Sequence, residues 1–379
     1  MSASNPLRAA RRIVVKIGSA LLVDQESGKI HHAWLEGLAR DVAALHAGGA
    51  EIIVVTSGAI AVGRRHLGLG QGVLRLEESQ AAAACGQIRL AHAYQAALAE
   101  HDVTIAQVLL TIDDMDNRRR YLNARNTITA LLGLGAVPVI NENDTVATAE
   151  IRFGDNDRLA AGVAAMMGAE ALVLLSSDID GLYTADPGSD PGAEWVPVVE
   201  RITPEIEAMA GAAGSSDASG GMVTKLIAAR AATASGCSMA IANGQGSQPL
   251  QGLLDGARAT WFLSQASPGS ARKHWITSAL QPRGALVIDA GAARALAGGK
   301  SLLPAGVAAV EGGFERGDAV VVRDGDGREL GRGLVAYSAS DATRIIGHKT
   351  GEIEAILGYR GRDEMIHRDD LVLAGEAGQ

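Results

Sequence analysis

Aromatic residues and cysteines are scarce in this chain. Phe, Trp and Tyr make up 3% of its 379 residues, whereas 47% of the residues are hydrophobic. The core must therefore consist mainly of Ala, Val, Leu and Ile, packed beside many of the 47 glycines. The two cysteines, Cys85 and Cys237, are too few for a disulfide-rich domain, and they predict reduced thiols in a cytoplasmic protein.

Long apolar runs and an excess of positive charge are also missing. No run approaches the roughly 18 residues of a membrane span, and the N-terminal sequence MSASNPLRAARR lacks the apolar stretch of a signal peptide. The formal net charge is −9, whereas nucleic acids and anionic membranes select basic surfaces. We therefore expect neither a membrane nor a nucleic acid as a partner.

Several catalytic motifs are absent as well. The sequence has no G-x-S-x-G elbow, no H-E-x-x-H helix, no Cys-x-x-Cys pair and no complete G-x-G-x-x-G after a strand. The nine histidines are scattered along the chain. The sequence therefore argues against zinc and haem chemistry.

Residues 12 to about 244 alternate short β-branched runs with amphipathic stretches at helical spacing, such as Leu35, Leu38 and Val42. This alternation predicts an α/β fold, a three-layer sandwich with a mostly parallel sheet between two layers of helices. The runs expected to form buried strands are Arg12–Lys16, Glu51–Val55, Thr104–Leu110, Ala136–Ile140, Ala171–Leu175 and Ser238–Ala242.

The character of the sequence changes after residue 244. Gly, Ser, Gln and Pro cluster at 244–249 and again at 265–270, and short alternating strands follow, with Asp-Gly pairs at 324–327 that predict a hairpin. We therefore predict an α/β domain over residues 9–265, a linker over 266–282 and a small β-rich domain over 283–374.

Two acid-amide clusters are the most informative feature of the chain. The residues Asn141-Glu142-Asn143-Asp144 follow the apolar run 136–140, and Asp155-Asn156-Asp157 opens a run with helical periodicity. The exit of a strand and the entrance of a helix are where an open α/β sheet keeps its ligand site. Carboxylates and amides can together hold an ammonium group, a carboxylate and a metal-bound phosphate, as the phosphorylation of an amino acid would require.

Two glycine turns could bind anions. Lys16 lies at the end of an apolar strand before Gly18-Ser19, and Ser57-Gly58 follows a second strand. Such turns expose backbone amides to phosphate or carboxylate groups, and a lysine beside one would find an anionic partner there. Each turn also has a simpler interpretation. Lys16 could extend from the strand end into solvent, and Ser57-Gly58 could be a tight turn with a serine cap.

Two further polar segments could belong to a nucleotide site. Asp178 and Asp180 follow another buried strand, and they could contact nucleotide hydroxyls or cap a helix. Lys225 follows Gly220-Gly221, which suggests a phosphate cradle, although the P-loop spacing is missing. The glycine-rich residues 211–221 are predicted to form a mobile loop.

Six segments of the chain resemble the motifs of the amino acid kinase family, in the family's order and over nearly all of residues 12–244. Within that family the resemblance is to the glutamate 5-kinases, because Ser301–Val307 and Phe314–Asp318 resemble parts of their C-terminal PUA domain, a small β-rich barrel. The six segments are Val15–Ser19, Val55–Ile60, Asn141–Thr145, Gly154–Asp157, Asp180–Pro187 and Gly220–Lys225.

This resemblance implies ATP-dependent phosphorylation of the γ-carboxylate of L-glutamate to L-glutamyl 5-phosphate, the first step of proline biosynthesis. It also implies Mg²⁺ as a cofactor, without naming a protein ligand for the ion, and feedback inhibition by proline. The expected assembly is a homodimer or homotetramer, with channelling of the product to glutamyl-phosphate reductase.

The resemblance also assigns roles to residues. Lys16 and Lys225 would contact the phosphates, with Asp157 organising both lysines. L-Glutamate would be held by Ser57, Asp144 and Asn156. The nucleotide site would comprise Lys16, Ser177, Asp178, Ser219, Gly220, Gly221, Met222, Val223, Thr224 and Lys225, with serine at 177 and 219 where threonine is common in the family.

Two other interpretations stay open on the sequence. One is another enzyme of the same family, such as acetylglutamate kinase, aspartokinase or a uridylate kinase. The acid-amide clusters argue against a nucleotide acceptor, and the β-rich C-terminal part differs from the regulatory domain expected of an aspartokinase. The other is an RNA-binding protein, since PUA domains often bind RNA. From Arg283 onward, however, acidic residues outnumber basic ones and aromatic stacking groups are scarce.

Overall fold

The computed structural model describes residues 5–24, 26–70, 72–147, 155–212, 221–278 and 281–374. The chain divides into two compact units, Met1–Asn117 with Asn123–Pro268, and Arg118–Leu122 with Gly269–Gln379. Helix α12 (Pro268–Ser278) occupies most of the segment that was expected to be a linker. The domain limits expected from the sequence stay a prediction.

An eight-stranded sheet forms the centre of the first unit, in the order β3-β4-β2-β1-β5-β9-β10-β8. Its strands are parallel except where β10 runs antiparallel to β9, which confirms the mostly parallel sheet expected from the sequence. The strands are β1 (Arg12–Ile17), β2 (Glu51–Val55), β3 (Ile105–Leu110), β4 (Val137–Glu142), β5 (Ala171–Ser176), β8 (Val198–Val199), β9 (Ser238–Asn243) and β10 (Ala259–Phe262). A separate small ribbon pairs β6 (Leu182–Tyr183) with β7 (Trp195–Val196).

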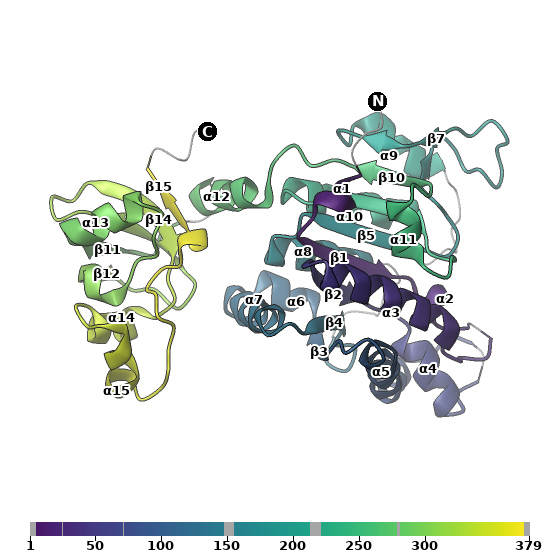
Figure 1. Ribbon diagram of the computed structural model, residues 1–379, viewed down its shortest axis with the longest axis horizontal. Helices are drawn as coiled ribbons and strands as arrows, with labels where there is room; N and C mark the ends of the chain where they lie inside the picture. The colour runs from purple at the N-terminus through teal and green to yellow at the C-terminus, as the bar shows by residue number, and fades with distance from the viewer. Residues whose placement is uncertain are drawn as a thin grey trace. The chain divides into compact units, whose positions relative to one another are not determined.

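Helices cover both faces of this sheet (Figure 1). Helices α3 and α5 pack against β2 and β3, while α8 packs against β1 and β5, and α10 against β9. The core cluster on the α3 and α5 side includes Ile13, Val15 and Ile17 of β1. Because side chains alternate along a strand, Lys16 points to the face that α8 and α10 cover. The helices before residue 268 are α1 (Pro6–Ala9), α2 (Ser19–Leu22), α3 (His32–Ala47), α4 (Ala59–His66), α5 (Leu76–Ala99), α6 (Ile112–Asp116), α7 (Arg118–Gly133), α8 (Asp155–Met167), α9 (Pro204–Ala212), α10 (Met222–Ala234) and α11 (Pro249–Leu254).

Helices α4 and α5 approach each other closely at two glycines. A Cβ atom on Gly63 would lie 1.7 Å from the carbonyl oxygen of Ala82, and one on Gly86 would lie 1.8 Å from that of Ala59. The first residues of α4 follow the Ser57 turn, and α5 carries side chains that reach the ends of β2 and β4. This contact therefore fixes the helices that surround the predicted glutamate site.

A Gly63→Ala substitution should lower the free energy of unfolding by about 1–3 kcal/mol, because the added methyl group overpacks the helix contact. The matched control is Gly133→Ala near the end of α7, where a Cβ atom would meet nothing within 4 Å. Thermal and urea unfolding of both variants would measure the difference. Equal stability of the two variants would show that α4 and α5 are not in contact at Gly63.

A second sheet forms the core of the C-terminal unit. Its strands lie in the order β12-β11-β13-β14-β15, antiparallel except between β11 and β13. Residues 324–327 form the turn between β13 and β14, which confirms the predicted hairpin. The core includes Leu286, Phe314 and Tyr337. The elements are β11 (Gly284–Ile288), α13 (Ala290–Ala297), β12 (Val307–Gly312), β13 (Ala319–Arg323), β14 (Glu329–Leu334), α14 (Ala339–Ile345), α15 (Ile353–Leu357) and β15 (Leu371–Leu373).

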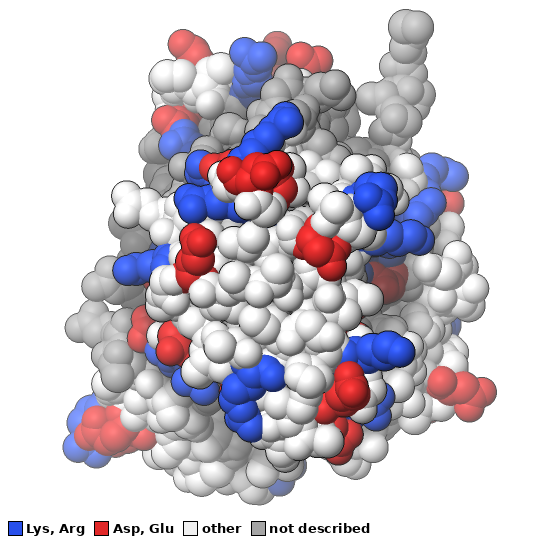
Figure 2. All heavy atoms as spheres, turned by 90° about the vertical axis from the view of Figure 1, so that its left-hand side faces the viewer, with Lys and Arg blue, Asp and Glu red and all other residues white. Residues whose placement is uncertain are grey.

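Charged side chains of both signs are interspersed on the face drawn in Figure 2. That face is the left-hand side of Figure 1, where β11 to β15 lie. Arg323 pairs with Glu311 at 3.3 Å, and Arg332 pairs with Glu329 at 2.8 Å. Among the residues that the structure describes, this face therefore offers no broad basic surface of the kind that RNA selects. The described part of the chain also contains no helix with the length and apolar character needed to cross a membrane.

Candidate active site

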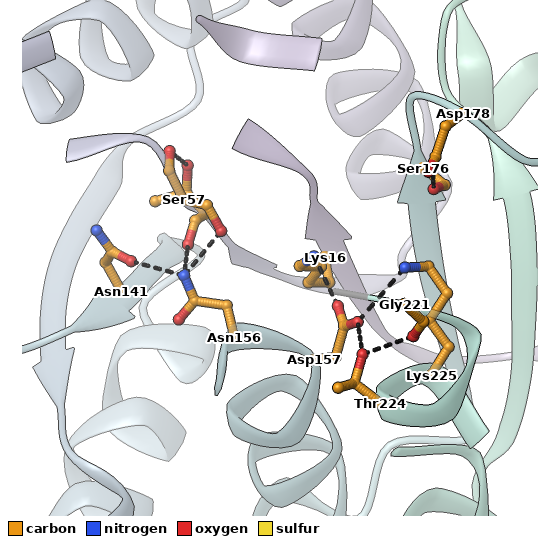
Figure 3. Close-up of polar contacts among 11 residues, drawn as sticks. Lys16, Ser57, Asn141, Asn156, Asp157, Ser176, Asp178, Gly221, Thr224 and Lys225 are labelled. Carbon is orange, nitrogen blue, oxygen red and sulfur yellow. Dashed lines mark hydrogen bonds and ion pairs between the residues drawn. The ribbon is translucent and has the colours of Figure 1, made fainter. Parts of the chain in front are cut away.

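The candidate site lies where four parallel strands end (Figure 3). Lys16 is near the end of β1, Thr56 follows β2, Asn141 is near the end of β4 and Ser176 closes β5. Because the strands are parallel and adjacent, their carboxyl ends share one edge of the sheet. The N-termini of α8 and α10 supply the other side chains of the site. The fold thereby collects residues that are far apart in the sequence.

An acid and two lysines form one end of the site. The Nζ atom of Lys16 lies 2.6 Å from Oδ1 of Asp157, and Nζ of Lys225 lies 3.8 Å from Oδ2 of the same carboxylate. The Asp157 side chain is only 1% exposed, and those of Lys16 and Lys225 are 13% and 10% exposed. The ammonium groups of buried Lys225 and partly buried Lys16 therefore share the carboxylate of Asp157. The Oγ1 atom of Thr224 also donates to Oδ2 of Asp157, at 3.4 Å.

Several charged groups act on Lys225. Burial lowers its pKa, and the nearby charge of Lys16 acts in the same direction, while the carboxylates of Asp157 and Asp178 act in the opposite direction. Removing a charge from water is costly unless a partner compensates it. Two ammonium groups close together form a site that suits an anion such as a phosphate.

An amide cluster forms the other end of the site. The Nδ2 atom of Asn156 donates to Oγ of Ser57 at 2.7 Å, to the carbonyl oxygen of Thr56 at 3.1 Å and to Oδ1 of Asn141 at 3.4 Å. The Oδ1 atom of Asn156 is buried and has no hydrogen-bond partner among the residues that the structure describes. Asn156 and Asp157 are neighbours at the start of α8, so the amide cluster lies directly beside the lysine pair (Figure 3).

The Ser57 turn depends on the glycine that follows it. Gly58 caps the N-terminus of α4 and has φ +96°, a left-handed conformation that side-chain-bearing residues rarely adopt. A Cβ atom at this position would also lie 2.9 Å from Cγ2 of Val23. The turn directs the Ser57 hydroxyl toward Asn156. Asp144 is buried shortly after β4, three residues beyond Asn141.

The predicted nucleotide residues lie at the ends of β5 and α10. Ser177 and Asp178 follow β5; Oγ of Ser176 donates to Oδ1 of Asp178 at 2.6 Å, and Nε2 of Gln245 donates to the carbonyl oxygen of Ser177 at 2.6 Å. Gly221 caps α10, and Met222, Val223 and Thr224 form its first turn, immediately before Lys225. Ser219 and Gly220, with most of the predicted mobile loop, lie outside the described residues.

Asp180 does not contribute to either cluster. Its carboxylate accepts a hydrogen bond from the hydroxyl of Tyr183 at 2.7 Å and pairs with Arg258 at 3.6 Å. The guanidinium group of Arg258 also lies over the ring of Trp195, 5.1 Å from its centre. These contacts tie the β6–β7 ribbon to the chain before β10, which is a structural role.

Two residues of α5 that the sequence analysis did not single out contact the site. The Oε1 atom of Gln87 accepts from Nδ2 of Asn141 at 2.7 Å, and the hydroxyl of Tyr94 lies 2.9 Å from Oγ1 of Thr56. Gln87 and Tyr94 share the buried face of α5 with Leu90. A glutamine at helical spacing among apolar residues is the sequence signal that could have identified the first of them.

Comparison with known families identifies both parts of the chain. The model of the amino acid kinase family matches residues 11–243, and that of the PUA domain matches residues 284–357. Among solved structures, the UMP kinase of Ureaplasma parvum is similar over 67% of this chain and 98% of its own, with 16% identity and a TM-score of 0.46.

Curated relatives match over nearly the whole chain. The glutamate 5-kinase of Paramagnetospirillum magneticum is 66% identical over 98% of this chain and 100% of its own length. Those of Dinoroseobacter shibae and Rhodospirillum rubrum are 60% and 61% identical, over 97% and 95% of this chain and 99% and 96% of their own lengths.

Proposed function

The chain belongs to the amino acid kinase family and, within it, to the glutamate 5-kinases, and from this premise we propose that it transfers the γ-phosphoryl group of ATP to the γ-carboxylate of L-glutamate. The product would be L-glutamyl 5-phosphate, the first intermediate of proline biosynthesis. The observation that carries this proposal is the buried carboxylate of Asp157 between the ammonium groups of Lys16 and Lys225, directly beside the amide cluster of Asn156.

Charge neutralisation is the main task that the reaction sets. A carboxylate that attacks the γ-phosphate brings two anions together, and phosphoryl transfer offers a protein little covalent work beyond positioning and electrostatic stabilisation. Lys16 and Lys225 would neutralise the phosphate oxygens, with Asp157 fixing the positions of both ammonium groups. The γ-carboxylate of glutamate is ionised at neutral pH, so the reaction needs no general base.

The amide cluster would bind the amino acid. The buried Oδ1 atom of Asn156 can accept a hydrogen bond from the α-ammonium group of glutamate, and Asp144 would supply the opposite charge. Ser57 and the first amides of α4 would face a carboxylate group of the substrate. Because Asn156 and Asp157 are consecutive in α8, one helix would align the acceptor with the phosphate site.

The nucleotide would lie between the residues that follow β5 and those that begin α10. Ser177 and Asp178 would contact it on one side, and Gly221 to Lys225 would cradle its phosphates at the N-terminus of α10. Gln245 supports this arrangement, because it holds the carbonyl oxygen of Ser177. Ser219 and Gly220 are proposed to complete the cradle, from the family resemblance alone.

Mg²⁺ would enter the site with ATP. No cluster of three or more His, Cys, Asp or Glu able to hold a metal ion occurs among the described residues. This fits an ion held chiefly by substrate phosphates, with at most one or two carboxylates, as Mg²⁺ often is. When bound, the ion would neutralise charge on the β- and γ-phosphates, in addition to the two lysines.

We further propose inhibition by proline, assembly as a homodimer or homotetramer, channelling of the product to glutamyl-phosphate reductase and a cytoplasmic location. Each of these follows from the family resemblance. The direct test of the proposed function is glutamate-dependent release of ADP, with hydroxylamine present to trap an acyl phosphate. Failure to form the hydroxamate with glutamate and MgATP would contradict it.

Asn156→Ala and Asp144→Ala should each raise the KM for glutamate about tenfold, which corresponds to the loss of one charge-assisted hydrogen bond. The KM for ATP should stay unchanged, because both side chains are proposed to hold only the amino acid. Initial rates over a matrix of glutamate and ATP concentrations would separate the two constants. A selective rise in the KM for ATP would mean that the acid-amide clusters bind the nucleotide instead.

A further inference from the structure

Three side-chain amides form a hydrogen-bonded row that leads from α5 into the site. The Nδ2 atom of Asn141 donates to Oε1 of Gln87 at 2.7 Å, and Nδ2 of Asn156 donates to Oδ1 of Asn141 at 3.4 Å. Asn141 is 2% exposed and Gln87 is 9% exposed, so water cannot readily replace these partners. The row ends at the buried Oδ1 atom of Asn156, which has no hydrogen-bond partner in the described part of the chain.

The backbone fixes the direction of this row. The amide N–H of Glu142 can only donate, and it meets Oδ1 of Asn141 at 2.9 Å. The Nδ2 atom of Asn141 must then point away from Glu142, toward α5. The carbonyl oxygen of Thr56 can only accept, and it meets Nδ2 of Asn156 at 3.1 Å. The oxygen of Asn156 is therefore turned away from Thr56, where it can receive only a donor group.

Gln87 is the group that satisfies the inner end of the row. Its Oε1 atom is the acceptor for Nδ2 of Asn141. Without that acceptor, a buried amide donor would lose its partner, and Asn141 would gain by rotating or shifting toward another one. Either movement would remove one of the three acceptors that hold Nδ2 of Asn156 in place.

We propose that Gln87 is a positioning residue for the glutamate subsite, which acts through Asn141 to hold the oxygen of Asn156 toward the α-ammonium group of the amino acid. This inference rests on the proposed function, because it assigns the unpartnered oxygen of Asn156 to glutamate. Gln87 itself does not touch the substrate. Its role is to keep the amide row in one arrangement, so that the subsite presents an acceptor to a cationic amine.

Four variants of the full chain test this role. Gln87→Glu keeps an acceptor for Asn141, Gln87→Met removes it, and Gln87→Asn withdraws it by one methylene. Gln95→Met is the matched control, since Gln95 is exposed on the same helix. Circular dichroism and thermal unfolding would identify the folded variants, and steady-state rates would give the KM for glutamate and for ATP separately. Gln87→Asn, the smaller change, keeps the test available if Gln87→Met fails to fold.

Gln87→Met and Gln87→Asn should raise the KM for glutamate by up to about 100-fold, the upper limit set by the cost of one buried unsatisfied donor. The KM for ATP should stay unchanged in both. The rise in the KM for glutamate should be smaller in Gln87→Glu, which keeps the acceptor for Asn141, and Gln95→Met should resemble the wild type. In an Asn156→Ala background, Gln87→Met should add no further rise, because the two residues would act through the same contact.

Two results would overturn the inference alone: an unchanged KM for glutamate in the folded Gln87→Met and Gln87→Asn variants, or equal rises for glutamate and ATP. Additive effects of Gln87→Met and Asn156→Ala would also overturn it, since Gln87 would then act by another route. A wild-type chain without glutamate-dependent ADP release would overturn the proposed function and this inference together.

Discussion

Replacing Lys16 with alanine should lower kcat by about 10²–10³-fold, by analogy with the loss of other groups that stabilise charge in a transition state. The ammonium group of Lys16 lies 2.6 Å from the carboxylate of Asp157 in a site from which water is largely excluded. Its loss would leave Lys225 as the single lysine beside Asp157, and would leave part of the phosphate charge without a counterion. The fold should persist, because the Lys16 side chain occupies the ligand site rather than the core.

The matched control for this variant is Lys29→Ala, at an exposed position of the same unit. Both proteins would be compared by single-turnover and steady-state rates at saturating glutamate and MgATP, with circular dichroism to establish folding. Lys29→Ala should retain the wild-type kcat. Near-normal turnover by folded Lys16→Ala would remove Lys16 from the site and leave the phosphate charge to Lys225 and Mg²⁺.

L-Glutamate should be preferred over N-acetylglutamate and L-aspartate by about 10²-fold or more in kcat/KM. Acetylation replaces the charged α-ammonium group with a neutral amide that keeps one N–H, so the charge-assisted contacts to Asp144 and the oxygen of Asn156 are weakened, which alone accounts for up to about 10²-fold. Aspartate is one methylene shorter, so its side-chain carboxylate would stop short of the phosphate while its α-groups stayed bound. A displacement of about 1 Å can cost on the order of 10²-fold in rate.

The three acids would be compared by kcat/KM in the ADP-release assay. A proline titration at two glutamate concentrations would follow, and proline is expected to compete with glutamate. Equal or better turnover of N-acetylglutamate would contradict the proposed acceptor and favour an acetylglutamate kinase activity. Inhibition by proline that is independent of glutamate concentration would place the inhibitor at a separate site.

The sequence by itself determined the class of the fold. The β-branched runs at 12–16, 51–55 and 171–175 predicted strands that agree with β1, β2 and β5 to within a residue. Regular helical and strand periodicities are local properties, so they can be recognised without knowledge of the tertiary structure. The six motifs also identified the family, which the family models and the curated relatives confirm.

Some local structure lay beyond the sequence signals. Strand β10 was not predicted, because it is short and lies in a region of mixed composition. Its pairing with β9 depends on contacts between segments that are distant in the sequence. Helix α12 occupies a segment that Gly, Ser and Pro made resemble a linker. In both places the propensities of a few residues were weaker than the tertiary contacts that decide the conformation.

The arrangement of the candidate site was decided only by the tertiary structure. The motifs named Lys16, Asp157 and Lys225. The order β2-β1-β5-β9 and the packing of α8 and α10 then place the ammonium group of each lysine within 4.0 Å of the Asp157 carboxylate. Gln87 gave only the weak signal of a polar residue on an apolar helix face, and the sequence could not identify its partner. Residue types and periodicity are properties of the chain and can be read from the sequence. The partner of a buried polar group is fixed by strand order and long-range packing, and such partners determine the chemistry of the site.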